Sequence, residues 1–111
     1  MIQNGDAMKT VPLKEVTIVA EALLEERLLR EIRELGAQGY TVGQVRGEGS
    51  RGVRASEWEG KNVRIETLVS AEVADRILTH IAEEYFEHYA VVAYLSDVQV
   101  VRGDKYLGDQ K

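Results

Sequence analysis

The residues best suited to chemistry lie close together in the middle of the chain. Two glycines, one serine and two arginines fall within eight positions: Gly47, Gly49, Ser50, Arg51 and Arg54. Glycine adopts positive φ readily, so its backbone N–H groups can turn toward an anion. The serine hydroxyl and the two guanidinium groups can donate hydrogen bonds to a phosphate. The segment therefore predicts a phosphate cradle, but not a P-loop, because no Gly-Lys-Ser/Thr follows at the required spacing.

On spacing alone, a solvated glycine-rich hairpin loop explains the same segment, because Gly and Arg are common in loops. Charge adds information. Residues 46–64 carry five basic and three acidic side chains, a local charge of +2 on a chain whose net charge is −5. A cationic segment on an acidic protein suggests a small anion as ligand, and the overall charge argues against a partner such as nucleic acid or an anionic membrane.

Other kinds of site find little support in the composition. The two histidines, His80 and His88, are too few for a metal site without help from carboxylates, so we predict no metal. Neither a Ser/His/acid nor a Cys/His arrangement can be argued, so we predict a protein that is not an enzyme and has no cofactor. The chain has no cysteine and no apolar run of the ~18 residues that span a bilayer. We therefore expect a cytoplasmic protein without membrane insertion.

The elements that must position the central segment follow from the hydrophobic pattern. Residues 14–20 and 63–69 alternate as strands, residues 40–45 do so imperfectly, and residues 90–101 form a long last strand. A first helix carries apolar residues at helical spacing and ends at two glycines: Leu24, Leu28, Ile32, Leu35, Gly36 and Gly39. A second helix starts at the cap Ser70 with Glu72 in its first turn, and its expected apolar face is Ala74, Ile77, Leu78, Ile81, Ala82 and Tyr85.

This order of elements, βαββαβ, predicts an α+β fold, a ferredoxin-like sandwich of two helices on one face of a four-stranded antiparallel sheet. Residues 47–62 form a long loop between the second and third strands, and loops of that length are usually functional or disordered. The domain is expected to cover residues 13–103, between a disordered tail at 1–12 and a C-terminal tail at 104–111. Apolar residues on both sides of the last strand predict a cyclic oligomer.

Four stretches of the sequence resemble one protein family. They are Gly-Tyr-Thr-Val at 39–42, Gly-Glu-Gly-Ser-Arg-Gly-Val-Arg at 47–54, Asn-Val-Arg-Ile-Glu at 62–66 and Glu-Tyr-Phe-Glu-His-Tyr-Ala at 84–90. Together they resemble the PII-like signalling proteins linked to bicarbonate transport and carboxysomes, of the SbtB-like and carboxysome-associated kinds. The resemblance covers roughly residues 16–103, and the stretch at 47–54 is its most specific part.

The resemblance implies a homotrimer with an adenine nucleotide in each cleft between subunits. The loop at 47–62 would be the family's T-loop, which changes order with ligand and touches the partner protein. The resemblance places Gly47, Gly49, Ser50, Arg51 and Arg54 around the phosphates of the nucleotide. Near the adenine and ribose it places Gly39, Tyr40 and Thr41. From the neighbouring subunit it places Tyr89, Ala90 and Val91, and Arg102 is a further phosphate contact.

The sequence also departs from nitrogen-signalling PII proteins, because residues 85–93 contain neither the glycine nor the lysine with which those proteins grip the outer phosphates of ATP. AMP or ADP is therefore the expected ligand, and bicarbonate is expected to share the pocket of Arg51 and Arg54. The expected role is to signal inorganic-carbon or energy status to a bicarbonate transporter or carboxysome-related partner. Trp58, inside the loop, contacts that partner or folds back on its own trimer. The alternative is a CutA-like structural or metal-handling trimer without nucleotide binding.

Overall fold

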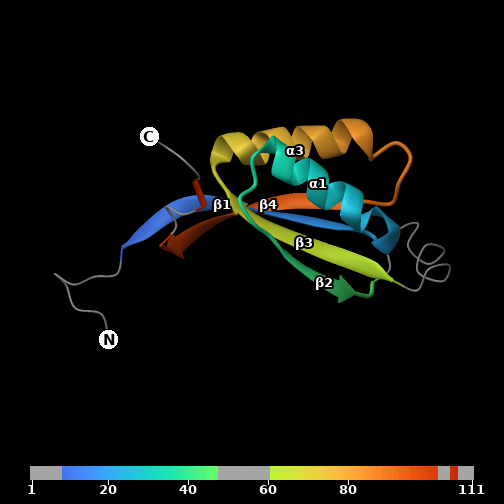
Figure 1. Cartoon of the computed structure of the whole chain (residues 1–111), viewed down its shortest axis with the longest axis horizontal. Coiled ribbons are helices and arrows are strands. Elements are labelled where there is room, and N and C mark those ends of the chain that lie inside the picture. Colours follow the sequence, from blue (N-terminus) through green and yellow to red (C-terminus); the bar gives the residue numbers. More distant parts are fainter. Residues whose placement is uncertain (1–8, 48–60, 103–105, 108–111) are drawn as a thin grey trace.

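The computed structural model describes residues 9–47, 61–102 and 106–107 (Figure 1). The elements follow one another in the expected order. They are β1 (Thr10–Glu21), the 3-10 turn η1 (Ala22–Leu24), α1 (Glu25–Leu35), β2 (Thr41–Val45), β3 (Asn62–Val69), α3 (Ala71–Glu84) and β4 (Val92–Val101).

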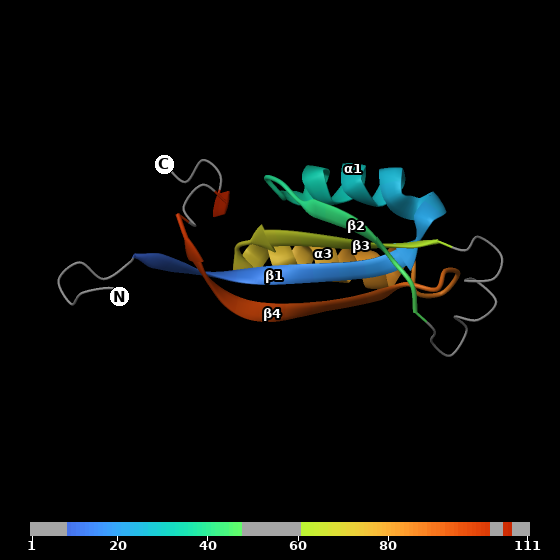
Figure 2. The same cartoon turned by 90° about the horizontal axis from the view of Figure 1, so that it is seen from below.

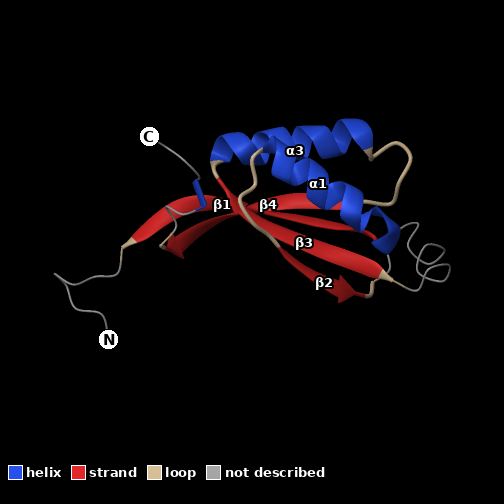
Figure 3. Cartoon of the chain, in the orientation of Figure 1, coloured by secondary structure: helices blue, strands red, loops and turns tan. Residues whose placement is uncertain are grey.

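The strands form one antiparallel sheet in the order β2-β3-β1-β4. Both helices cover the same face of this sheet (Figure 3). The predicted ferredoxin-like α+β fold is thus confirmed. The register places Thr41, Glu66, Thr17 and Tyr94 in one row across the four strands.

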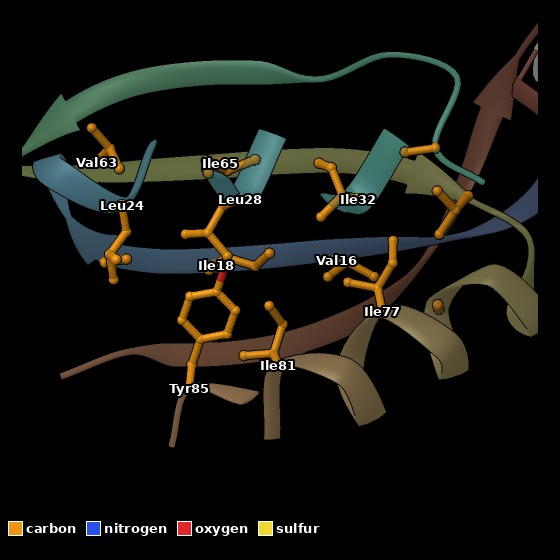
Figure 4. Close-up of a cluster of buried hydrophobic side chains, with 14 residues drawn as sticks. Val16, Ile18, Leu24, Leu28, Ile32, Val63, Ile65, Ile77, Ile81 and Tyr85 are labelled. Carbon is orange, nitrogen blue, oxygen red and sulfur yellow. The ribbon is translucent and has the colours of Figure 1, made fainter. Parts of the chain in front are cut away.

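The core lies between the sheet and the two helices (Figure 4). Val16 and Ile18 of β1 are fully buried, as the alternation predicts, and Ile65 of β3 lies opposite Ile18. The helices contribute apolar side chains that are fully or almost fully buried: Leu28, Ile32, Ala74, Ile77, Ile81 and Tyr85. The apolar face of α3 is narrower than expected, since Ala82 is exposed and Leu78 only half-buried.

Both predicted helix boundaries are confirmed, and each has a local cause. Gly36 follows α1 with φ of 128°, a conformation that strains any residue with a Cβ. A Cβ at this position would also lie 2.9 Å from Cγ2 of Val73 on α3. At the start of α3, the Val73 N–H donates a 3.2 Å hydrogen bond to the Ser70 hydroxyl.

Some boundaries differ from the sequence expectation. β1 begins at Thr10, so residues 10–12, which we expected in the tail, are strand residues because they pair with β4. β4 begins at Val92 and not at residue 90, because the backbone N–H groups of His88 and Tyr89 donate to the Tyr85 carbonyl and hold that stretch in turns. Tyr106 and Leu107, expected in the C-terminal tail, form a short helical turn.

No helix among the described residues covers the other face of the sheet, and Figure 2 shows this side with α3 behind the sheet. On β4 it exposes Val92 and Tyr94, which are 57% and 50% accessible. Such an apolar surface is typical of an interface between subunits. None of the helices in the described part of the chain is long and apolar enough to cross a membrane.

Candidate functional site

A cavity of about 430 Å³ lies where the connection between α1 and β2 meets β3. Three separate parts of the chain line it: residues 38–41, residues 66–68 and Tyr106. Its volume falls within the roughly 300–1,000 Å³ range of small-molecule pockets. Gly39, Tyr40 and Thr41 line the cavity, and these are the three residues that the family resemblance places near an adenine and ribose.

One hydrogen bond fixes the wall of this cavity. The Thr67 hydroxyl, on β3, donates a 2.6 Å hydrogen bond to the Gly39 carbonyl. Thr67 is 2% exposed, so its hydroxyl requires a partner inside the protein. The bond ties the turn before β2 to β3, where Thr41 then pairs with Glu66. Residues 39–41 are therefore held in place before any ligand arrives.

Tyr40 has a cationic neighbour. The Arg33 guanidinium carbon, in the last turn of α1, lies 5.4 Å from the centre of the Tyr40 ring. This distance is within the range of a cation–π contact. The contact restrains the Tyr40 ring and places a positive charge beside the residues that line the cavity.

The cavity lining combines polar and apolar groups. Gln38 can both donate and accept hydrogen bonds, the Glu66 carboxylate accepts them, and Leu68 and Tyr106 add apolar surface. A flat heterocycle with amino groups and ring nitrogens fits this set. Sequence reasoning missed these four residues as site residues. The alternation of β3 does put Glu66 on the face opposite Ile65, but only the strand register brings Glu66 beside Thr41.

A second group of predicted site residues lies elsewhere in the chain. Tyr89, Ala90 and Val91 immediately precede β4, which is one edge of the sheet, whereas Thr41 begins β2 at the other edge. Three strand spacings separate the two edges, about 14 Å. One subunit therefore does not bring these two groups into one pocket, and a shared site requires two subunits.

Tyr89 belongs to a cluster of polar and aromatic side chains that joins α1 to the end of α3. Glu31 Oε1 accepts a 2.6 Å hydrogen bond from the Tyr85 hydroxyl and lies 2.9 Å from His80 Nε2. Glu31 Oε2 accepts a 3.1 Å hydrogen bond from Arg27 Nε. The Arg27 guanidinium carbon lies 4.6 Å and 5.9 Å from the ring centres of Tyr85 and Tyr89.

The environment shifts two pKa values in this cluster. Burial raises the pKa of Glu31, but the hydrogen bonds from Tyr85, His80 and Arg27 outweigh it and hold the pKa below its ordinary value. Burial, and then the hydrogen bond to Glu31, raises the pKa of Tyr85. At neutral pH the pair is therefore a carboxylate and a neutral phenol. Sequence reasoning weighed His80 as a metal ligand and missed this cluster.

The remaining predicted site residues are spread along the chain. Arg102 follows β4 at the end opposite to Val91, and the ten residues of the strand span about 33 Å. Gly47 is exposed two residues after β2. Outside the described residues lie Gly49, Ser50, Arg51, Arg54 and Trp58. Within the described ranges, no three His, Asp or Glu side chains gather as metal ligands would.

Comparisons with known proteins agree with this architecture. The family model of the nitrogen regulatory protein P-II matches residues 13–105. A crystal structure described as a PII-like signalling protein from Thermus thermophilus is 63% identical, with a TM-score of 0.79 over 90% of this chain and 100% of that chain.

A second similar protein is CPII from Thiomonas intermedia. Its structure bound to ADP, AMP and bicarbonate is 26% identical, with a TM-score of 0.78 over 92% of this chain and 100% of that chain. Its structure bound to ADP and bicarbonate is 27% identical, with a TM-score of 0.79 over 90% of this chain and 99% of that chain.

Proposed function

The chain belongs to the nitrogen regulatory protein P-II family, and we propose that it is a regulatory protein that binds ADP or AMP in clefts between the subunits of a homotrimer. Proteins of this family are signalling proteins that form trimers. The uncovered sheet face, with Val92 and Tyr94 exposed on β4, supplies an apolar surface for such an assembly.

The observation that carries the proposal is the cavity beside β2. It gathers residues 38–41 and 66–68 around a volume of about 430 Å³, and the hydrogen bond from Thr67 to Gly39 preorganises one wall. CPII, whose fold is similar, has been solved with ADP, AMP and bicarbonate. The same classes of ligand are therefore the ones we assign to this protein.

The nucleotide would lie across the seam between two subunits. Its base and ribose would contact Gly39, Tyr40 and Thr41, and the neighbouring subunit would supply backbone groups of Tyr89, Ala90 and Val91. The placement of these two groups on opposite edges of the sheet supports this division. Arg102 remains a proposed contact for the phosphates of the nucleotide.

ADP and AMP are preferred over ATP in this proposal. Residues 85–93 contain no glycine or lysine. Backbone hydrogen bonds to the Tyr85 carbonyl hold part of this stretch in turns, and the Tyr85 and Tyr89 rings pack together at 5.6 Å. This stretch therefore offers no glycine backbone and no ammonium group to a third phosphate.

The phosphates would bind the T-loop at residues 47–62 through Gly47, Gly49, Ser50, Arg51 and Arg54. A ligand that binds one state of a loop better shifts the population toward that state. Bicarbonate would share the pocket of Arg51 and Arg54. The ordered loop would then signal inorganic-carbon or energy status in the cytoplasm to a bicarbonate transporter or carboxysome-related protein, with Trp58 as a contact.

A titration tests the proposal. AMP, ADP, ATP and bicarbonate are added separately while thermal stability and Trp58 fluorescence are followed. A ligand at a hundred times its Kd stabilises the folded state by about 2.7 kcal/mol, so ADP and AMP should raise the melting temperature. The double variant Arg51→Ala/Arg54→Ala should lose most of this rise. An intact trimer whose melting temperature responds to no nucleotide would instead support the CutA-like alternative.

A further inference from the structure

The residue in the cavity that neither the sequence pattern nor the proposed function explains is Tyr106. It lines the same cavity as Gly39 and Thr41, although it lies more than sixty positions further along the chain. Tyr106 is half-buried and belongs to the short helical turn that it forms with Leu107. An aromatic ring has thus been brought from the C-terminal part of the chain to the wall of the cavity.

The end of β4 has an unusual backbone conformation. Arg102 has φ of 59°, a left-handed conformation that few non-glycine residues adopt. Such a residue ends the strand and lets the chain leave the strand direction. Four residues later, Tyr106 lines the cavity.

The lining of the cavity leaves one role open for this ring. Gln38, Thr41 and Glu66 supply hydrogen-bonding groups, and these can bind the edge of a heterocycle. The flat face of the same heterocycle requires an apolar or aromatic surface. Tyr106 is the lining residue outside residues 38–41 that offers an aromatic one, and aromatic rings are common stacking partners of nucleotide bases.

We propose that the Tyr106 ring stacks on the nucleotide base and sets the affinity of this cavity for purines. The inference rests on the proposed function, because it presupposes that the base enters the cavity. It adds a contact from the C-terminal segment, so that one subunit holds the base from two sides. The phenol hydroxyl has no part in it, so phenylalanine should replace tyrosine at this position.

Calorimetric titration of the full-length trimer with ADP tests this inference. Tyr106→Ala should weaken ADP binding by about five- to a hundred-fold, the usual loss when a stacking aromatic is removed. Tyr106→Phe should stay within about twofold of the wild-type affinity. Leu107→Ala is the matched control, because Leu107 is half-buried in the same turn but does not line the cavity.

A second measurement remains decisive even if Tyr106→Ala does not fold. Photolabelling of the wild-type protein with 2-azido-ADP should modify the tryptic peptide 106–111, which begins at Tyr106 because Lys105 precedes it. Excess unlabelled ADP should prevent the modification. Labelling confined to other peptides would overturn the inference.

The outcomes separate the inference from the proposed function. Wild-type protein that binds ADP, with Tyr106→Ala binding it equally well or more tightly, would overturn the stacking role alone. Tighter binding would mean that the ring occupies the cavity and competes with the base. Wild-type protein that binds no adenine nucleotide would overturn both.

Discussion

The hydroxyl of Tyr85 donates a 2.6 Å hydrogen bond to the carboxylate of Glu31, and this bond joins the end of α3 to the middle of α1. Tyr85 is fully buried, and its hydroxyl is satisfied because it donates to Glu31. The Glu31 carboxylate in turn has Arg27 and His80 as neighbours. The bond therefore holds the two helices together just before the turn that carries Tyr89.

Tyr85→Phe should lower the free energy of unfolding by about 1.5–3 kcal/mol, because it removes a hydrogen bond to a charged group but keeps the ring in the core. Urea denaturation at a fixed protein concentration measures the change. Phe86→Leu is the control, since Phe86 is half-exposed in the turn after Tyr85, and it should change stability by less than about 0.5 kcal/mol. Equal effects of the two substitutions would show that the bond contributes nothing.

Glu31 should make stability depend on pH in the acidic range. Its pKa in the folded protein lies below the ordinary value of 4.5, so the unfolded chain takes up a proton first as the pH falls. The stabilisation is fully present above pH 4.5 and is lost as the pH falls through the lower, folded pKa.

The wild-type protein and Glu31→Gln can be compared by urea denaturation between pH 7 and pH 3. The stability gap between them should narrow below about pH 4.5. Glu34→Gln, on the exposed face of the same helix, should leave the fall in the free energy of unfolding toward acidic pH unchanged. A constant gap between the wild type and Glu31→Gln across the range would contradict the assigned direction of the pKa shift.

Gly36→Ala should destabilise the protein by about 1–3 kcal/mol. The residue has φ of 128°, and the new methyl group would lie 2.9 Å from Val73. Gly43→Ala is a matched control on β2, because a Cβ there meets no atom within 4 Å. Thermal denaturation should show a lower melting temperature for Gly36→Ala and not for Gly43→Ala. An unaltered melting temperature for Gly36→Ala would refute the steric argument.

Thr67→Val should weaken ADP binding, because the turn at Gly39 loses the hydrogen bond that holds it on β3. A loss of about three- to ten-fold is expected, along with a destabilisation of about 1 kcal/mol. Thr67→Ser keeps the hydroxyl and should bind ADP nearly as well as the wild type. If the valine variant binds ADP as well as the wild type, the methyl group that valine keeps, and not the hydrogen bond, fixes the wall.

The hydrophobic pattern was sufficient to predict the fold because each element has its own period. Ile18 and Ile65 follow the alternation of a strand, and Leu28 and Ile32 follow the spacing of a helix. Helix ends were predictable for the same local reason, since Gly36 and Ser70 act through their own backbone or side chain.

The composition of the cavity could not be predicted in this way. Residues 39–41 were placed by a family resemblance. Glu66 joins them only through the strand register, and Tyr106 only because the turn at residues 106–107 lies against the cavity. The partners of Glu31 depend likewise on how α1 and α3 pack together. Such contacts between distant parts of the sequence have no local signature.

The position of Gly39 and Tyr89 at opposite edges of one sheet has a consequence for mixed assemblies. If each nucleotide bridges two subunits, a subunit with an inactivating substitution beside Gly39 and a subunit with one beside Tyr89 can complement each other. In a mixed trimer, the intact Tyr89 edge of the first variant can lie against the intact Gly39 edge of the second and form a complete site. Co-expression of the two inactive variants would then recover part of the lost nucleotide binding. The bound nucleotide would also stabilise the trimer against dissociation.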